Sequence, residues 1–196
     1  MSAIESVMRV WSNVANISLR EVNAGNYTDT ATILFGNYSS RTDGSNGFAF
    51  TPSNNETAFS SSEGDVWLNN SKNSFLSPGA GSYNYLTILH EAGHALGLAH
   101  PANYNASNTP NVTITYANDA TYVEDSLQYT VMSYFEASET GANHVYNGNT
   151  IYATTPLLHD IAAMQRLYGA NTNIAKGDTV YGFHNTGDSA YALTSS

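Results

Sequence analysis

The spacing of apolar residues along the chain predicts three helices. Over residues 3–16 the apolar side chains recur at steps of three and four residues, the period of a helix with one buried face. A second helix is expected from about Tyr83 to Gly97. A third is expected to begin with Thr155 as N-cap and Pro156 at the first helical position, and to stop at Gly169. The expected buried residues are Ile4, Val7, Met8, Trp11 and Val14 in the first helix, Leu86, Leu89 and Leu96 in the second, and Leu157, Ile161, Met164 and Tyr168 in the third.

Short apolar or alternating runs between the first two helices predict strands at residues 17–22, 31–36, 48–52 and 64–69. The run 31–36 is apolar on both faces and is therefore expected in the centre of a sheet. Residues 102–130 are rich in Asn and Tyr and favour a loop. Strands and helices that occur in separate runs predict an α+β domain.

Composition excludes several classes of protein. A chain of 196 residues is long enough for one domain with a substantial core. The net charge of −10, with six Lys plus Arg, argues against nucleic acid or an anionic membrane as partner. Cysteine is absent, which excludes disulfides and thiolate ligands, and no apolar run is long enough to span a membrane. This acidic sequence, rich in Asn, Ser and Thr, favours a soluble, secreted monomer.

The strongest chemical signal is the motif H-E-x-x-H-x-x-G-x-x-H from His90 to His100. On a helix, His90 and His94 lie one turn apart and project from one face. Gly97 can adopt a left-handed conformation that ends the helix and brings His100 back as a third nitrogen ligand. Three protein ligands leave one position of a tetrahedral zinc open, as in a catalytic site. Glu91 is placed to act as general base on a zinc-activated water.

A bare H-E-x-x-H motif arises by chance in many chains, but the added Gly and third His make coincidence improbable. The chain contains six histidines, and three of them fall on the motif. The alternative is a surface helix with unconnected histidines. The motif therefore predicts zinc as the cofactor, and we expect no metal at His144, His159 and His184.

Further positions resemble the serralysin branch of the metzincin metallopeptidases. Pro101 follows the third His, and residues 131–135, Val-Met-Ser-Tyr-Phe, are similar to the serralysin Met-turn. The similarity continues through residues 122–125, 156–169 and 177–183. The resemblance implies that Met132 lies beneath the zinc. It also implies that Tyr134 is a movable zinc ligand that swings to hydrogen-bond the oxyanion during catalysis.

The resemblance implies a metzincin-like zincin fold: a twisted mixed β-sheet with an antiparallel edge strand, a long active-site helix, the Met-turn and a C-terminal helix. This protease domain would cover residues 1–172, without the strand that precedes the first helix in the family. Residues 173–196 resemble the start of the linker to a calcium-binding repeat roll. Calcium is therefore a second candidate ion, with Ala175, Gly177 and Thr179 as implied carbonyl ligands. Asp119, Glu124 and Asp125 offer further oxygen ligands, although a solvated acidic loop is the simpler interpretation.

The resemblance also implies where substrate binds. In the family, the strand that corresponds to residues 64–69 is the antiparallel edge of the sheet above the cleft. A substrate chain can add to such an edge through backbone hydrogen bonds. The expected substrate-binding residues are therefore Val66, Trp67, Leu68 and Asn69, and the alternative is an ordinary edge strand.

The resulting prediction is a secreted, extracellular zinc endopeptidase that hydrolyses internal bonds of protein or peptide substrates. A small proteinaceous inhibitor is a further partner that the resemblance implies. Residues 1–5 have neither the basic nor the apolar region of a signal peptide, and no G-G-x-G-x-D repeat occurs. We therefore expect a catalytic-domain piece, or a member that has lost its roll, with an export signal elsewhere.

Two alternatives stay open. The first is a non-catalytic, zinc-stabilised binding or adhesion module cut from a larger secreted protein. The intact Glu91 argues against it, because ligation alone does not need that carboxylate. The second is another branch of zinc endopeptidase, such as a matrixin, which Pro101 and residues 131–135 disfavour.

Overall fold

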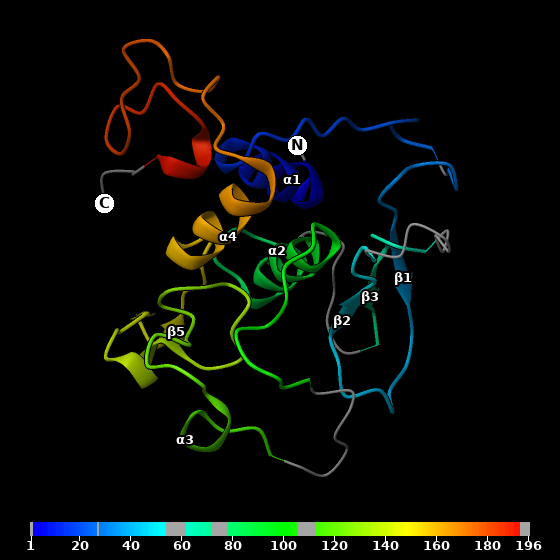
Figure 1. Ribbon diagram of the computed structural model, residues 1–196, viewed down its shortest axis with the longest axis vertical. Helices are drawn as coiled ribbons and strands as arrows, with labels where there is room; N and C mark the ends of the chain where they lie inside the picture. Colours follow the sequence, from blue (N-terminus) through cyan, green and yellow to red (C-terminus); the bar gives the residue numbers. More distant parts are fainter. Residues whose placement is uncertain (1, 27, 54–61, 72–77, 106–112, 193–196) are drawn as a thin grey trace.

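Figure 1 shows the computed structural model, which describes residues 2–26, 28–53, 62–71, 78–105 and 113–192. Helices and strands are both present, as the predicted α+β class requires. The helices are α1 (Ala3–Val14), α2 (Tyr83–Ala95), α3 (Tyr116–Asp119) and α4 (Leu158–Tyr168), with two 3-10 turns, η1 (Ala137–Thr140) and η2 (Ser189–Tyr191). The strands are β1 (Phe35–Tyr38), β2 (Gly47–Ala49), β3 (Val66–Asn69), β4 (Val145–Tyr146) and β5 (Asn149–Thr150).

The three predicted helices form, and α2 lies at the centre of the molecule. α1 packs against α2 and α4, while α2 also contacts β2 and β3. In Figure 1, α2 accordingly lies between α1 and α4 on one side and the sheet on the other. Trp11 of α1 is fully buried and donates a hydrogen bond from Nε1 to the carbonyl of Leu89 in α2, at 3.2 Å. α2 is therefore buried on most of its surface, and the motif it carries is held by core packing.

Local signals at the helix ends explain where two of the helices begin. The Ser2 hydroxyl accepts the N–H of Glu5 at 3.2 Å, and the Glu5 carboxylate accepts the N–H of Ser2, which is a capping box at the start of α1. The predicted start of α4 at Thr155 and Pro156 is wrong, because the N-cap is Leu157. Its N–H donates to Oδ2 of Asp160 at 2.8 Å, so a carboxylate inside the first turn supplies the cap.

The three-stranded sheet has the order β1-β3-β2, with β1 parallel and β2 antiparallel to β3. This is the mixed sheet that was predicted, but two strands occupy other positions in it than predicted. The run 31–36 was expected in the centre, yet its strand begins at Phe35 and lies at an edge among the described strands. β3 was expected at the antiparallel edge and lies in the centre, whereas β2 is the antiparallel edge strand.

Residues 17–22, predicted as a strand, are extended but pair with none of the described strands. Ile17 and Leu19 are partly buried and pack against the core, while Ser18 and Arg20 are exposed. The alternation that suggested a strand is therefore present in the burial. A β-strand also needs a hydrogen-bonded neighbour, so the strand prediction is wrong although burial alternates over residues 17–20.

The short hairpin of β4 and β5 was not predicted, although its sequence signal is strong. Asn147 and Gly148 connect the two strands with φ of 49° and 77°. Two successive left-handed residues define a type I′ turn, for which Asn-Gly is a preferred pair. The hairpin is therefore specified by a local turn signal that the sequence analysis did not use.

The end of the described chain folds back onto α1. Oδ2 of Asp188 lies 2.7 Å from Nε of Arg9 and accepts a hydrogen bond from Nδ2 of Asn13 at 2.8 Å. The expected boundary between residues 172 and 173 stays a prediction. None of the described helices combines the length and the apolar character that crossing a membrane would need.

Candidate metal centre

Three histidine side chains converge at the end of α2. His90 and His94 lie one turn apart on the helix, Gly97 has a φ of 96° and reverses the chain, and His100 returns from the following segment. The Nε2 atoms are separated by 3.1 Å between His90 and His94, 3.2 Å between His90 and His100, and 3.0 Å between His94 and His100. Within the described part of the chain, these histidines are the one group of three or more His, Asp or Glu side chains close enough to hold a metal ion together.

The other nitrogen of each ring is held by a backbone carbonyl. Nδ1 of His90 lies 2.8 Å from the carbonyl of Val131, Nδ1 of His94 lies 2.7 Å from that of Leu98, and Nδ1 of His100 lies 2.8 Å from that of Tyr104. A carbonyl can accept but cannot donate, so each Nδ1 carries the proton. Each Nε2 therefore directs a lone pair toward the other two.

This arrangement fits zinc. Three lone pairs that face each other at 3.0–3.2 Å repel unless a cation lies between them. Nitrogen ligands about 2.0–2.1 Å from a tetrahedral zinc would lie about 3.3–3.4 Å apart, close to the observed separations. Hydrogen bonds from Nδ1 to carbonyls are also the usual support of zinc-binding histidines.

Burial keeps the three histidines neutral. Loss of solvent lowers the pKa of His90 well below its ordinary value, and the neighbouring His94 and His100 lower it further. Burial also lowers the pKa of His94. The pKa of His100 is lowered to about 4, mainly by burial and to a smaller extent by repulsion from His94. Neutral imidazole is the form that binds a metal, so the site is ready for a metal at neutral pH.

Glu91 is buried beside the histidines, on the side of the antiparallel edge strand. Its side chain is 7% exposed, and burial raises its pKa to about 8. A Cβ atom built on Gly47 of β2 would lie 3.3 Å from Cγ of Glu91, so the Glu91 side chain packs close to this strand. A cation nearby would favour the charged carboxylate, which is the form a general base requires.

Met132 packs directly beneath α2, at Gly93. A Cβ atom on Gly93 would lie 2.6 Å from Sδ of Met132 and 3.2 Å from the ring of Trp11. Glycine inside a helix costs about 1 kcal/mol relative to alanine, and the close approach of these two side chains explains its presence. Met132 is 2% exposed, and the carbonyl of its neighbour Val131 is the one that orients His90.

A second support of His90 was not predicted: the carboxylate of Asp160 in α4. Its Oδ1 accepts the hydroxyl of Thr130 at 2.5 Å, and its Oδ2 accepts the N–H of Val131 at 2.9 Å. Asp160 is 1% exposed, and burial raises its pKa while its hydrogen bonds oppose that rise. The carboxylate therefore fixes the turn at Val131, and the carbonyl of Val131 orients His90.

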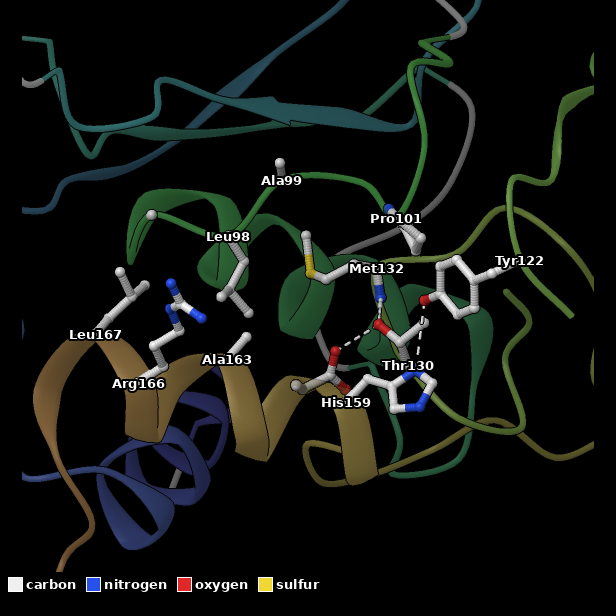
Figure 2. Close-up of a pocket in the computed structure, with 12 residues that line it drawn as sticks. Leu98, Ala99, Pro101, Tyr122, Thr130, Met132, His159, Ala163, Arg166 and Leu167 are labelled. Carbon is white, nitrogen blue, oxygen red and sulfur yellow. Dashed lines mark hydrogen bonds between the residues drawn. The ribbon is translucent and has the colours of Figure 1, made fainter. Parts of the chain in front are cut away.

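Figure 2 shows this turn from the side of α4, where Thr130, Met132 and His159 face a cavity of about 300 Å³. His159 turns away from Asp160, as expected for adjacent helical residues. Its Nε2 lies 3.0 Å from Oε2 of Glu124, and its Nδ1 lies 3.4 Å from the hydroxyl of Tyr122. Of these two neighbouring residues, Asp160 therefore provides a buried structural carboxylate, and His159 is a partly exposed histidine near the surface.

Tyr134 lies over the histidines. Its ring centroid is 4.5 Å from that of His100 and 6.0 Å from that of His90, and the residue is 37% exposed. The ring centroid of Tyr104 lies 5.0 Å from that of Tyr134. The Tyr134 ring therefore packs against two of the three histidines and remains partly exposed, and its catalytic role stays a prediction.

The four residues expected to bind substrate do not form the outer edge of the sheet. Val66 and Leu68 are buried, and the Asn69 amide donates to the carbonyls of Ser40 and Ser45 at 2.9 and 3.1 Å. Trp67 belongs to the same strand, which has a neighbour on each side. The assignment of Val66, Trp67, Leu68 and Asn69 to an edge strand is therefore wrong, because strand pairing places β2 outside β3.

The three acidic candidates for calcium do not converge. Asp119 accepts the N–H of Thr115 at 2.7 Å, Glu124 contacts His159, and Asp125 is fully buried and accepts the hydroxyl of Tyr104 at 2.9 Å. Among the described residues these three carboxylates therefore form no shared ion site, and the preferred interpretation as a solvated acidic loop is wrong for Asp125. In the tail, the carbonyl of Gly177 accepts the N–H of Thr179 at 2.8 Å. The expected calcium site at Ala175, Gly177 and Thr179 stays a prediction.

Comparison with known proteins gives two consistent findings. The family model described as Matrixin matches residues 1–134. The chain is 43% identical over 191 residues to metallopeptidase AprA of Pseudomonas marginalis, covering 96% of this chain and 38% of that protein. It is 39% identical over 195 residues to serralysin B of Dickeya chrysanthemi, covering 96% and 37%, and 45% identical over 195 residues to a serralysin of Proteus mirabilis, covering 95% and 38%. The chain thus spans less than two fifths of the length of these relatives.

Proposed function

The chain belongs to the metzincin peptidases, in the family whose model is described as Matrixin, and within it is of the serralysin type; from this premise we propose that it is a zinc-dependent endopeptidase. One observation carries the proposal: the Nε2 atoms of His90, His94 and His100 converge, and Glu91, the residue that follows the first of them, is buried. Metal binding alone would not need the carboxyl group of Glu91. The prediction that the chain is of the serralysin type, based on Pro101 and residues 131–135, is confirmed by its relatives.

The proposed mechanism assigns a separate task to each side chain. His90, His94 and His100 hold the zinc, which when bound supplies a Lewis acid that acidifies water and polarises a carbonyl group. Glu91 takes the proton of the attacking water and delivers it to the leaving nitrogen. Tyr134 donates a hydrogen bond to the oxyanion that develops on the scissile carbonyl. Met132 supports the site from below, through its contact with α2 at Gly93.

We assign recognition of the substrate backbone to the outer edge of β2, in place of β3. Phe50 donates to the carbonyl of Asp65, and Asn69 donates to that of Asn46. Backbone groups at even positions of β2 therefore face β3, and those of Gly47 and Ala49 face outward. A substrate chain that adds here runs past Glu91, which contacts Gly47. Recognition through backbone groups favours broad specificity for unfolded protein or peptide substrates.

The setting in which the peptidase acts is part of the same proposal. The acidic composition and the serralysin-type relatives support a monomeric enzyme that acts outside the cell. A small proteinaceous inhibitor that enters the β2 edge in place of substrate is a partner this geometry would accommodate. The net charge of −10 argues against nucleic acid and anionic membranes as partners.

Cleavage of unfolded casein, with zinc content measured on the same sample, tests the proposal. We expect about one zinc per chain, cleavage that is lost on chelation, and recovery on addition of zinc. Glu91→Gln should keep its zinc and lose about 10²–10⁴-fold in turnover, the usual contribution of a general base. Zinc binding without cleavage in the parent would favour the non-catalytic binding module. A Glu91→Gln variant as active as the parent would refute the mechanism.

A further inference from the structure

We propose that Tyr104, held by the buried Asp125, is the positioning residue that sets the third zinc ligand and Tyr134 relative to each other. The inference rests on the zinc centre proposed above. It concerns His100, the ligand that the helix itself does not place.

His100 needs an anchor outside α2. His90 and His94 belong to the helix, so their spacing follows from helical geometry. His100 lies beyond Gly97, in a segment without helix or strand. The position of this third ring therefore depends on tertiary contacts made by the segment that carries it.

Tyr104 supplies such contacts through its carbonyl group, its ring and its hydroxyl group. Its carbonyl accepts the Nδ1–H of His100 at 2.8 Å. Its ring stacks on that of His100, with centroids 5.4 Å apart and planes at 23°, and it also contacts Tyr134 at 5.0 Å and Phe135 at 5.1 Å. Its hydroxyl donates to Oδ1 of Asp125 at 2.9 Å. One side chain thus links the segment that carries His100 to the turn that carries Tyr134.

Asp125 is an unusual partner for a purely structural tyrosine. It is fully buried, and its Oδ2 makes no hydrogen bond within the described part of the chain. Tyr104 is also buried, at 5% exposure. A buried carboxylate with so few partners is unfavourable for stability, and an apolar pair of similar shape would serve the fold as well. The pair is therefore better explained by the directional bond that it provides.

The bond from the hydroxyl to Asp125 fixes the far end of the Tyr104 side chain, and with it the tilt of the ring. A ring that can tilt no longer holds the stacked His100 in one position. Residues that orient metal ligands from outside typically contribute about 10–100-fold to metal affinity. The expected effect of losing the hydroxyl is therefore a rise of that size in the dissociation constant for zinc.

Tyr104→Phe removes the hydroxyl and keeps the ring and the carbonyl. Tyr116→Phe is the matched control, because the Tyr116 hydroxyl also donates one bond, at 2.7 Å to the carbonyl of Val123, and its ring packs on the same Phe135 at 5.5 Å. The double variant Tyr104→Phe/Asp125→Leu replaces both partners by apolar groups. It should restore folding stability without restoring the directional bond.

The measurements are the zinc dissociation constant, by competition with a chromophoric chelator, and the visible absorption spectrum of the cobalt-loaded chain. We expect Tyr104→Phe and the double variant to bind zinc about 10–100-fold more weakly and to change the cobalt spectrum, while Tyr116→Phe matches the parent. A merely structural role would lower the melting temperature of the metal-free protein and leave both readouts unchanged in the stable double variant.

Parent-like zinc affinity in the double variant would overturn the inference, as would an equal loss of affinity in Tyr116→Phe. These readouts do not depend on peptidase activity. A parent chain that binds zinc but leaves casein intact would refute the proposed function, and the affinities of the variants would still decide the role of Tyr104.

Discussion

Replacing Glu91 by Gln should make the zinc-free protein more stable at alkaline pH, by an amount that the burial of this side chain determines. The pKa of Glu91 rises from its ordinary 4.5 to about 8 because the side chain loses its solvent. Below pH 4.5 the carboxyl group is protonated in both the folded and the unfolded chain, so it costs nothing. Above that value the unfolded chain releases the proton and the folded chain retains it, so the free energy of unfolding falls as pH rises.

The size of the effect follows from the same two pKa values. Each pH unit between them costs about 1.4 kcal/mol, and the full interval corresponds to about 5 kcal/mol. Above about pH 8 both states are ionised and the penalty becomes constant. Glutamine has the same size and no charge, so a Glu91→Gln variant avoids the penalty throughout. Histidine titration is the same in both proteins and cancels in the difference between them.

Urea unfolding in the presence of a chelator, followed by tryptophan fluorescence from about pH 5 to about pH 9, measures the difference directly. The advantage of Glu91→Gln should grow with pH and level off near pH 8. Glu139→Gln, at an exposed position, is the matched control and should give a flat difference. Excess zinc should reduce the advantage, because a cation beside Glu91 stabilises its charged form. A difference for Glu91→Gln that stays flat between about pH 5 and about pH 8 would refute the argument from burial.

Three smaller predictions follow from the packing around the site. Gly93→Ala gains about 1 kcal/mol of helix propensity but forces a Cβ atom to within 2.6 Å of Sδ of Met132, an overpacking that costs about 1–3 kcal/mol. A lower melting temperature is expected, and Gly44→Ala, whose added Cβ meets nothing within 4 Å, should leave it unchanged. Asp160→Asn turns an amide toward backbone N–H donors, so urea unfolding should show a loss of about 2–4 kcal/mol, and an unchanged stability would contradict the role given to this carboxylate. Asp188→Ala removes a partly exposed ion pair with Arg9, a hydrogen bond from Asn13 and the cap of η2, so urea unfolding should show a loss of about 1–2 kcal/mol, and an unchanged stability would contradict the docking of the tail on α1.

Much of the metal centre could be predicted from the sequence, because its main parts are local. His90 and His94 are four residues apart on one helix, and Gly97 reverses the chain within the next turn. The geometry of an α-helix and the conformational freedom of glycine are properties of short segments. The three Nε2 atoms therefore converge as the motif predicts.

The residues that support the ligands were not predictable in the same way. Asp160 lies far from His90 in sequence and reaches it through the turn at Val131. Tyr104 and Asp125 are 21 residues apart, with no periodic pattern between them. Their roles depend on which segments meet in space. A carboxylate or hydroxyl that looks like an ordinary surface group in the sequence becomes a buried support only after folding.

The sequence by itself determined the three main helices, most of their inward-facing residues and the spacing of the zinc ligands, since each of these depends on residues a few positions apart. Tyr168, predicted to be buried, is the exception at 37% exposure. Tertiary structure decided the order of the strands. β3 is as apolar as a central strand should be, but only its pairing with β1 and β2 shows that it is not the edge. Residues 17–20 alternate in burial and still pair with none of the described strands. The physical reason is that a helix satisfies its backbone hydrogen bonds internally, whereas a strand must satisfy them with a neighbour that the local sequence does not specify.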